Sequence, residues 1–231
     1  MGFSLQDITI YYRGSVIKDA PEDWNFRKKV NYIADFYHNR LNGYKPPKTG
    51  RICVHLGPTK DWDKPHYFGA ICSYDNTIDE SKYLGLTKLE KYKYILELLH
   101  QTIIELADIY GWDKSIFMSA YNYILESDFK FEKSYPEKKS KDRKHIAQII
   151  LIKTEDKSSL LVQMKTNDII NKQVLLEKNN WYWFDSSYDM AKTCKWLDNL
   201  SFGLYKNGKN CYYSLESNKI ISDLIFEADH F

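Results

Sequence analysis

The chain has 231 residues, a length that allows either one large domain or two small lobes. Hydrophobic residues make up 43% and charged residues 28%, which excludes global disorder, and the formal net charge of +2 argues against a dedicated nucleic-acid binder. No apolar run approaches the length of a membrane span, and the first residues lack the basic and apolar regions of a signal peptide. These features predict a cytoplasmic protein with no membrane association.

The first third of the chain predicts a strand, a helix and two further strands. Residues 5–12 form a strand-like run that closes at Arg13 and Gly14. Residues 19–41 begin with a capping-box-like pattern and then place apolar residues three and four apart, which is typical of an amphipathic helix. Residues 51–56 alternate, residues 66–74 are rich in β-formers, and a turn-rich connector joins the two runs. We therefore expect these two strands to pair as an antiparallel hairpin.

The strongest local pattern is a helix over residues 87–110. Thr87 and Glu90 have the spacing of a capping box, in which each side chain satisfies a backbone N–H of the other residue. A continuous apolar stripe follows, widened by further isoleucines and leucines, and Gly111 ends it. The width of the stripe predicts a buried, central helix, after which Asp113 caps a shorter helix.

The second half of the chain reads mainly as β-structure. Residues 134–145 carry five basic and two acidic side chains, so we interpret them as an exposed basic linker. Residues 146–153 and 158–165 are joined by a short polar turn and predict a hairpin, whereas residues 168–178 fit a strand or a helix equally. Asn207 and Gly208 predict another hairpin, because both tolerate positive φ.

Together these elements predict an α+β fold, in which antiparallel hairpins pack on a central long helix. We divide the chain into two closely packed lobes: residues 1–133, containing the helix, and residues 146–231, mainly antiparallel sheet, joined by the linker at 134–145. The sequence shows no glycine-rich nucleotide loop, no serine-nucleophile motif and no paired-cysteine zinc pattern. We expect no cofactor, and we expect reduced thiols at the four widely spaced cysteines.

One group of side chains has the composition of a metal site. His55, Asp61, Asp63 and His66 lie in or beside the connector between two predicted strands, where nitrogen and oxygen ligands could converge on a divalent ion. The alternative is ordinary turn chemistry, with the histidines at strand ends.

A second group has a partial nuclease pattern. Asp156 precedes an apolar strand that contains Gln163 and Lys165. This arrangement resembles the core of PD-(D/E)xK nucleases, in which two acidic residues hold Mg²⁺ and a lysine stabilises charge near the attacked phosphate. The resemblance covers about ten residues, and Gln163 replaces the second acid with a poorer Mg²⁺ ligand. The alternative is an amphipathic hairpin with Gln163 and Lys165 in solvent.

His100 and Glu97 share one face of the predicted central helix, at a spacing of three residues. Such a pair could act as an acid–base couple. The ordinary interpretation is a histidine at the border between the apolar stripe and solvent.

The aromatic content favours a recognition surface. The chain has 19 Tyr, 11 Phe and 6 Trp, and aromatic anchors concentrate binding energy at protein interfaces. Several tryptophans fall at or near element ends and form our candidate binding residues: Trp62, Trp112, Trp181, Trp183 and Trp196. We therefore expect the partner to be another protein.

The stretch LEKYKYILELLHQTIIELADIYGWD resembles helices of small cytoplasmic immunity proteins from bacterial toxin systems. This resemblance implies a chain that neutralises a cognate toxin by binding it, with no chemistry of its own. The leading hypothesis is therefore a non-enzymatic protein-binding module of the immunity type. Two alternatives stay open: a metal-dependent nuclease, and a small-ligand-binding protein with a pocket between its lobes.

Overall fold

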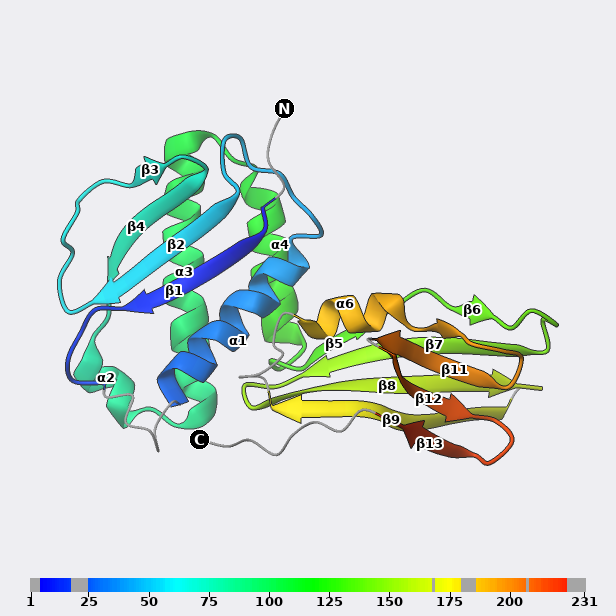
Figure 1. The fold of residues 1–231 in the computed structure, drawn as a ribbon. Coiled ribbons are helices and arrows are strands. Elements are labelled where there is room, and N and C mark those ends of the chain that lie inside the picture. The colour runs from blue at the N-terminus through cyan, green and yellow to red at the C-terminus, as the bar shows by residue number, and fades with distance from the viewer. Residues whose placement is uncertain (1–4, 18–24, 168, 180–185, 207, 224–231) are drawn as a thin grey trace. The chain divides into compact units, whose positions relative to one another are not determined.

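A computed structural model describes residues 5–17, 25–167, 169–179, 186–206 and 208–223. The chain divides into two compact units, Met1–Lys130 and Phe131–Phe231 (Figure 1). Helices and strands occur in both units, so the fold is mixed α+β. No described helix is long and apolar enough to cross a membrane.

The first unit is built on a four-stranded sheet with the order β1-β2-β4-β3. Strands β1 (Asp7–Tyr12), β2 (Arg51–Gly57) and β4 (Ile71–Thr77) run parallel, and β3 (His66–Phe68) pairs antiparallel with β4. The predicted antiparallel hairpin of residues 51–56 with residues 66–74 is therefore wrong. Gly69, with a φ of 57°, turns the chain inside that run, so residues 66–68 form β3 and residues 71–77 return parallel to β2.

Among the described residues, four helices accompany this sheet: α1 (Asn25–Arg40), α2 (Glu80–Gly85), α3 (Lys88–Tyr110) and α4 (Lys114–Glu126). The capping box of Thr87 and Glu90 is confirmed, as are the left-handed Gly111 that ends α3 and the Asp113 cap of α4. Helices α1, α3 and α4 pack against one another, α1 packs on β1, and α3 packs on β4. In Figure 1, α3 passes behind the sheet and α4 lies behind α1.

The second unit contains antiparallel strands and one described helix. Its sheets have the orders β5-β7-β8-β9 and β10-β11-β12-β13, with β6 paired to β7. The elements are β5 (Phe131–Ser134), β6 (Lys138–Lys139), β7 (His145–Lys153), β8 (Lys157–Thr166), β9 (Ile169–Asn179), α6 (Ser186–Thr193), β10 (Lys195–Trp196), β11 (Ser201–Lys206), β12 (Lys209–Ser214) and β13 (Lys219–Ser222). The hairpin of residues 146–153 and 158–165 is confirmed as β7 and β8, and α6 packs on both strands.

The segment 134–145 differs from the exposed linker that its charge predicts. It lies within the second unit, and it includes β6 and the buried residues Tyr135 and Ser140. The backbone of Ser140 bonds to His145, which closes a tight turn through Arg143 at a φ of 61°. The Lys138 ammonium group donates to the carbonyls of Lys192 and Cys194. The charged side chains of this segment are typical of a solvated loop, but its backbone pairs with β7 as a strand.

Candidate functional site

The sheet of the first unit has one face that none of the described helices covers. Ile8 and Ile10 of β1 are buried against the core, whereas Tyr11 is 46% exposed on the opposite face. Tyr11, His55 and Asp75 are register partners across β1, β2 and β4, and Phe68 of β3 pairs with Ile71. We call this side, together with the adjoining connector residue Trp62, the open face.

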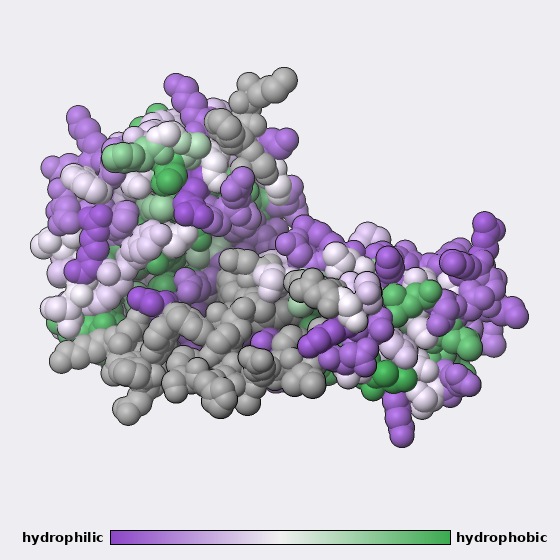
Figure 2. Space-filling model, viewed as in Figure 1, coloured by the Kyte–Doolittle hydropathy of each residue, from purple (hydrophilic) through white to green (hydrophobic). Residues whose placement is uncertain are grey.

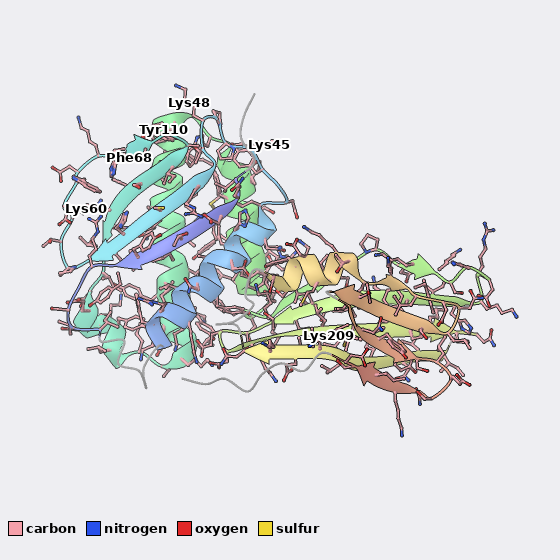
Figure 3. The ribbon with its side chains drawn as sticks, viewed as in Figure 1. Lys45, Lys48, Lys60, Phe68, Tyr110 and Lys209 are labelled. Carbon is pink, nitrogen blue, oxygen red and sulfur yellow. The ribbon has the colours of Figure 1, made fainter. Side chains whose placement is uncertain are left out.

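Large aromatic side chains are exposed on the open face. Besides Tyr11, Trp62 is 44% exposed and Phe68 is 78% exposed. Figure 2 views the sheet from this side and shows hydrophobic residues scattered among white and hydrophilic ones over the strands. Figure 3 shows Phe68 standing at the β3 end of the sheet. The open face therefore combines apolar anchors with polar side chains, as protein interfaces do.

Rings from β1, β2, the connector and β3 form one cluster on this face. The Tyr11 ring lies parallel to the His55 imidazole, with 5.3 Å between centroids. His55 meets Trp62 edge-on at 6.4 Å, and Trp62 meets His66 edge-on at 4.1 Å. Offset and edge-to-face contacts of this kind stabilise beyond the buried area alone, so the cluster holds the Trp62 ring in a defined position.

An ion-pair cluster supports the same tryptophan. The guanidinium of Arg13 lies 4.9 Å from the Trp62 ring centre, and its Nη1 is 2.7 Å from Oδ2 of Asp61 and 3.2 Å from Oδ2 of Asp75. The backbone N–H of Asp61 also donates to Asp75 Oδ2, at 2.9 Å. Asp75 is a buried side chain near the carboxyl end of β4. It therefore links β4 to the connector and to Arg13, the residue that follows β1.

The His55 imidazole in this cluster has a pKa shifted in favour of its neutral form. Burial lowers the pKa of His55 below its ordinary value, the positive charge of Arg13 lowers it further, and Asp75 opposes the shift. A neutral imidazole stacks on Tyr11 without the desolvation cost of a buried cation.

The four candidate metal ligands do not form a metal site among the described residues. No group of three or more His, Cys, Asp or Glu side chains there is placed to share a metal ion. Asp61 is occupied by Arg13, and the two imidazoles of His55 and His66 contact the Trp62 ring. Asp63 is exposed. In the structure, His55 and His66 contact the Trp62 ring and do not converge on a shared ion position.

The other candidate tryptophans are placed differently from Trp62. Trp112 is only 4% exposed, so it is not available as a surface anchor; it packs against Tyr110 and Phe117. Trp196 is half-buried and donates its indole N–H to the carbonyl of Lys138. Trp181 and Trp183 lie outside the described residues.

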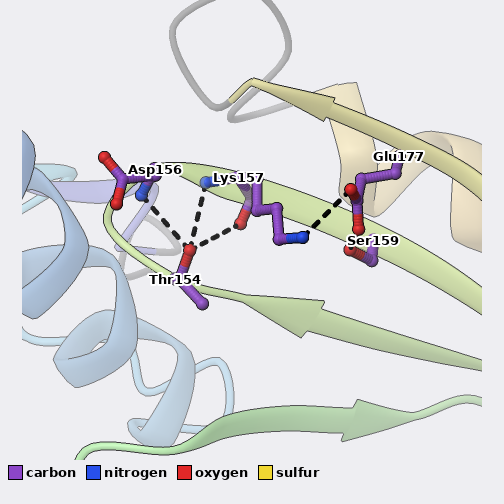
Figure 4. A network of polar contacts seen from close by, with 5 residues as sticks. All are labelled: Thr154, Asp156, Lys157, Ser159 and Glu177. Carbon is purple, nitrogen blue, oxygen red and sulfur yellow. Dashed lines mark hydrogen bonds and ion pairs between the residues drawn. The ribbon is translucent and has the colours of Figure 1, made fainter.

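The three residues of the nuclease pattern are spread along a hairpin. Asp156 lies in the turn before β8, where its N–H donates to Thr154 Oγ1 (Figure 4). Gln163 lies seven residues further on, about 20 Å away at the rise of an extended strand. Its amide donates to Gln148 at 3.2 Å. Asp156 and Gln163 therefore cannot hold one Mg²⁺ ion in this hairpin.

Figure 4 shows the polar contacts of the turn and of the first residues of β8. The Lys157 ammonium lies 3.0 Å from Oε1 of Glu177 on β9, and the Ser159 hydroxyl donates to Oε2 of the same carboxylate at 2.6 Å. These bonds lower the pKa of Glu177. The network links β8 to β9, so Lys157, Ser159 and Glu177 have a structural role in the pairing of these strands.

His100 belongs to a packed network between helices. Its Nδ1 lies 2.8 Å from the hydroxyl of Tyr37, and its ring stacks on Tyr121 at 4.2 Å. Tyr121 in turn donates to Glu97, at 2.6 Å, so Glu97 does not bond directly to the histidine. Burial lowers the pKa of His100. His100 is 7% exposed, so it is buried among its partners and does not lie at the border between the apolar stripe and solvent.

Sequence reasoning missed four residues of the open face: Tyr11, Arg13, Phe68 and Asp75. The alternation within residues 5–12 could have placed Tyr11 opposite Ile8 and Ile10. The other contacts depend on strand pairing across long sequence separations. Comparison of the chain with protein families, with curated proteins and with solved structures finds no match.

Proposed function

We propose that the protein is a non-enzymatic protein-binding module and that the open face of the first unit is its contact surface. The observation that carries this proposal is the exposure of Tyr11, Trp62 and Phe68 on one sheet face, with the guanidinium of Arg13 stacked on Trp62. Tyr, Trp and Arg are the residue types in which interfaces concentrate binding energy.

The rigidity of the cluster also supports binding. Trp62 is held between Arg13 and His66, and Arg13 is held by two aspartates. A side chain that is already fixed in its bound position loses less conformational entropy on association. The immunity-type role fits this arrangement, since neutralising a toxin requires a tight, chemically inert contact; the role itself stays a proposal.

The test is affinity capture with the full chain, in parallel for the native protein and for three variants. Trp62→Ala and Phe68→Ala remove anchors from the open face. Tyr205→Ala removes an aromatic of β11 in the second unit whose exposure, 60%, lies between theirs. We expect one stoichiometric partner with the native chain and with Tyr205→Ala, and at least about a tenfold loss of affinity with each open-face variant.

Two results would overturn the proposal. One is a partner that binds Trp62→Ala and Phe68→Ala as tightly as the native chain. The other is the absence of a stoichiometric partner at native expression levels. Circular dichroism of each variant shows whether it has kept its fold, so a binding loss can be assigned to the surface.

A further inference from the structure

The positive charge of the second unit is concentrated in residues 137–144, which we call the basic turn. Residues 131–231 carry 16 basic and 14 acidic side chains, a net of +2. The basic turn alone carries five basic and two acidic side chains, a net of +3, so the rest of the unit has a net of −1. The neighbouring residues 195–199 add one lysine and one aspartate, which leaves this balance unchanged.

Four of the five cations are exposed and form no ion pair with any residue that the structure describes. They lie within six consecutive residues: Lys139, Lys141, Arg143 and Lys144. The fifth, Lys138, is half-buried and is used inside the unit, because its ammonium group donates to the carbonyls of Lys192 and Cys194. The basic turn therefore presents four cationic side chains to a ligand.

Hydrogen bonds hold the backbone of the basic turn. The Ser140 hydroxyl donates to Oδ1 of Asp142 at 2.6 Å, and the backbone N–H of Lys144 donates to the same oxygen at 3.2 Å. The N–H of Asp142 donates to Oδ1 of Asn199, also at 3.2 Å, and the indole of Trp196 donates to the carbonyl of Lys138 at 2.8 Å. The backbone is thus fixed before a ligand arrives, so binding has to order only the exposed side chains.

We propose that the basic turn binds the phosphate backbone of a nucleic acid. Phosphate oxygens accept hydrogen bonds and do not donate them, and the turn offers mainly donors. Besides the four cations, these include the amide nitrogen of Asn199, whose oxygen already accepts from Asp142. Lys, Arg and Asn are residue types that contact phosphates, and such contacts position a protein on a nucleic acid without reading its sequence.

An acidic protein surface fits the basic turn less well. Protein interfaces are depleted in lysine and centred on apolar or aromatic anchors, whereas residues 134–145 expose no large hydrophobic side chain. The near-neutral charge of the whole chain argues against a dedicated nucleic-acid binder, so the contact is a local one that depends strongly on salt. It lies in the second unit and does not depend on the open face.

The test measures the binding of labelled probes to the full chain by fluorescence anisotropy at several salt concentrations. The probes are a twenty-nucleotide oligothymidylate, a DNA duplex of twenty base pairs and a polyglutamate of twenty residues. Each neutralised phosphate releases counterions, so four contacts to a single strand give a slope of log K against log salt of about −3. We expect the oligothymidylate to bind about 50-fold more weakly at 200 mM than at 50 mM salt. A tighter complex with the duplex would identify duplex DNA as the source of the phosphates.

Neutral variants locate the contact. Lys141→Gln/Lys144→Gln removes two of the four exposed cations, so it should reduce the slope to about −1.5 and weaken binding of both nucleic acids at least about tenfold at 50 mM salt. The matched control Lys93→Gln/Lys209→Gln removes the same charge from exposed positions of α3 and β12, and it should leave the slope unchanged. Circular dichroism checks that both variants keep the fold.

Three results would overturn the inference. Polyglutamate that binds as tightly as the nucleic acids would assign the basic turn to an acidic protein. A salt slope that is the same for Lys141→Gln/Lys144→Gln and the native chain would place the contact elsewhere. Failure of both nucleic acids to bind at 50 mM salt would remove the site. All three leave the proposed function standing, because the open-face residues Trp62 and Phe68 are unchanged in these variants.

Discussion

Arg13 and Asp75 join the two outer parallel strands of the first sheet across β2: Nη1 of Arg13, just after β1, lies 3.2 Å from Oδ2 of Asp75 on β4. Asp75 is 2% exposed, and its Oδ1 is buried without a hydrogen-bond partner. All of its polar contacts therefore go through Oδ2, to Arg13 and to the backbone N–H of Asp61. The carboxylate is a structural link between β1, β4 and the connector that presents Trp62.

We expect Asp75→Ala to lower the free energy of unfolding by about 2 kcal/mol, because it leaves the Asp61 N–H without its acceptor and weakens the hold on Arg13. The loss stays below that of a fully buried pair because Arg13 is partly exposed and keeps Asp61. Urea unfolding measures it, with the exposed Asp63→Ala as the control, expected within about 0.5 kcal/mol of the native chain. Equal effects of the two variants would show that the Asp75 link carries no stability.

The sequence predicts α3 well because the signals for this helix are local. The capping box, the apolar stripe and the terminal glycine all lie within 25 consecutive residues, 87–111, and each acts on its neighbours. The pairing of β2 was predicted wrongly because a β-rich run carries no sign of its partner. A two-residue turn at Gly69 splits that run, and parallel pairing depends on contacts between distant segments.

The candidate site shows the same division. The connector around Trp62 was picked out because its histidines and aspartates are close in sequence, and the structure does bring His55, Trp62 and His66 into contact. The arrangement of these residues depends on Arg13, which follows β1 and lies 48 residues before Asp61, and on Asp75 of β4. The histidines and aspartates of the connector have the composition of a metal site. The pairing of β1, β2 and β4 instead places Tyr11, His55 and Asp75 side by side, so that the connector packs as an aromatic cluster.

Gly203 of β11 should not accept a side chain. A Cβ at this position would lie 2.1 Å from the carbonyl oxygen of Cys211 and 2.5 Å from Cα of Tyr212, both main-chain atoms of the paired strand. We expect Gly203→Ala to destabilise the protein by about 3 kcal/mol. Gly85→Ala in α2, where a Cβ meets nothing within 4 Å, should instead stabilise it by about 0.5 kcal/mol. Thermal denaturation of both variants tests the difference in sign, and matching shifts would contradict it.

The capping box of α3 should contribute to the free energy of unfolding, and this contribution should depend on pH. Thr87→Ala removes the hydroxyl that the Glu90 N–H contacts, and should cost about 1 kcal/mol, whereas Thr87→Ser should retain most of it. The hydroxyl and N–H of Thr87 lower the pKa of Glu90, so its contribution is present above the unfolded pKa and is lost as the pH falls through the folded pKa. Urea unfolding should show the Thr87→Ala deficit shrinking in acid; a constant deficit would exclude the ionised pair as its source.

The buried His100 should make the protein less stable in mild acid. Its pKa is lowered chiefly by burial, and Glu97 opposes the shift. The unfolded chain therefore takes up the proton first, and the free energy of unfolding falls as the pH drops from about 6.5 towards the folded pKa. His55 shifts in the same direction.

His100→Asn should reduce this decline between pH 7.5 and 5.5, and combination with His55→Asn should reduce it further. The measurement is the slope of unfolding free energy against pH, not the absolute stability, so packing losses in the variants do not obscure it. An unchanged slope in the double variant would assign the acid sensitivity to other groups.

The separation of Asp156 from Gln163 predicts that the protein does not cleave nucleic acids through the β7–β8 hairpin. About 20 Å between the two positions is too far for one Mg²⁺ ion, whose ligands lie about 2 Å from the metal. Incubation of the full chain with plasmid DNA and with single-stranded RNA, in Mg²⁺, in Mn²⁺ and in EDTA, should give the same background as the Lys165→Ala variant. Metal-dependent cleavage by the native chain that disappears in both Lys165→Ala and Asp156→Ala would revive the nuclease hypothesis and require the hairpin to rearrange around the ion.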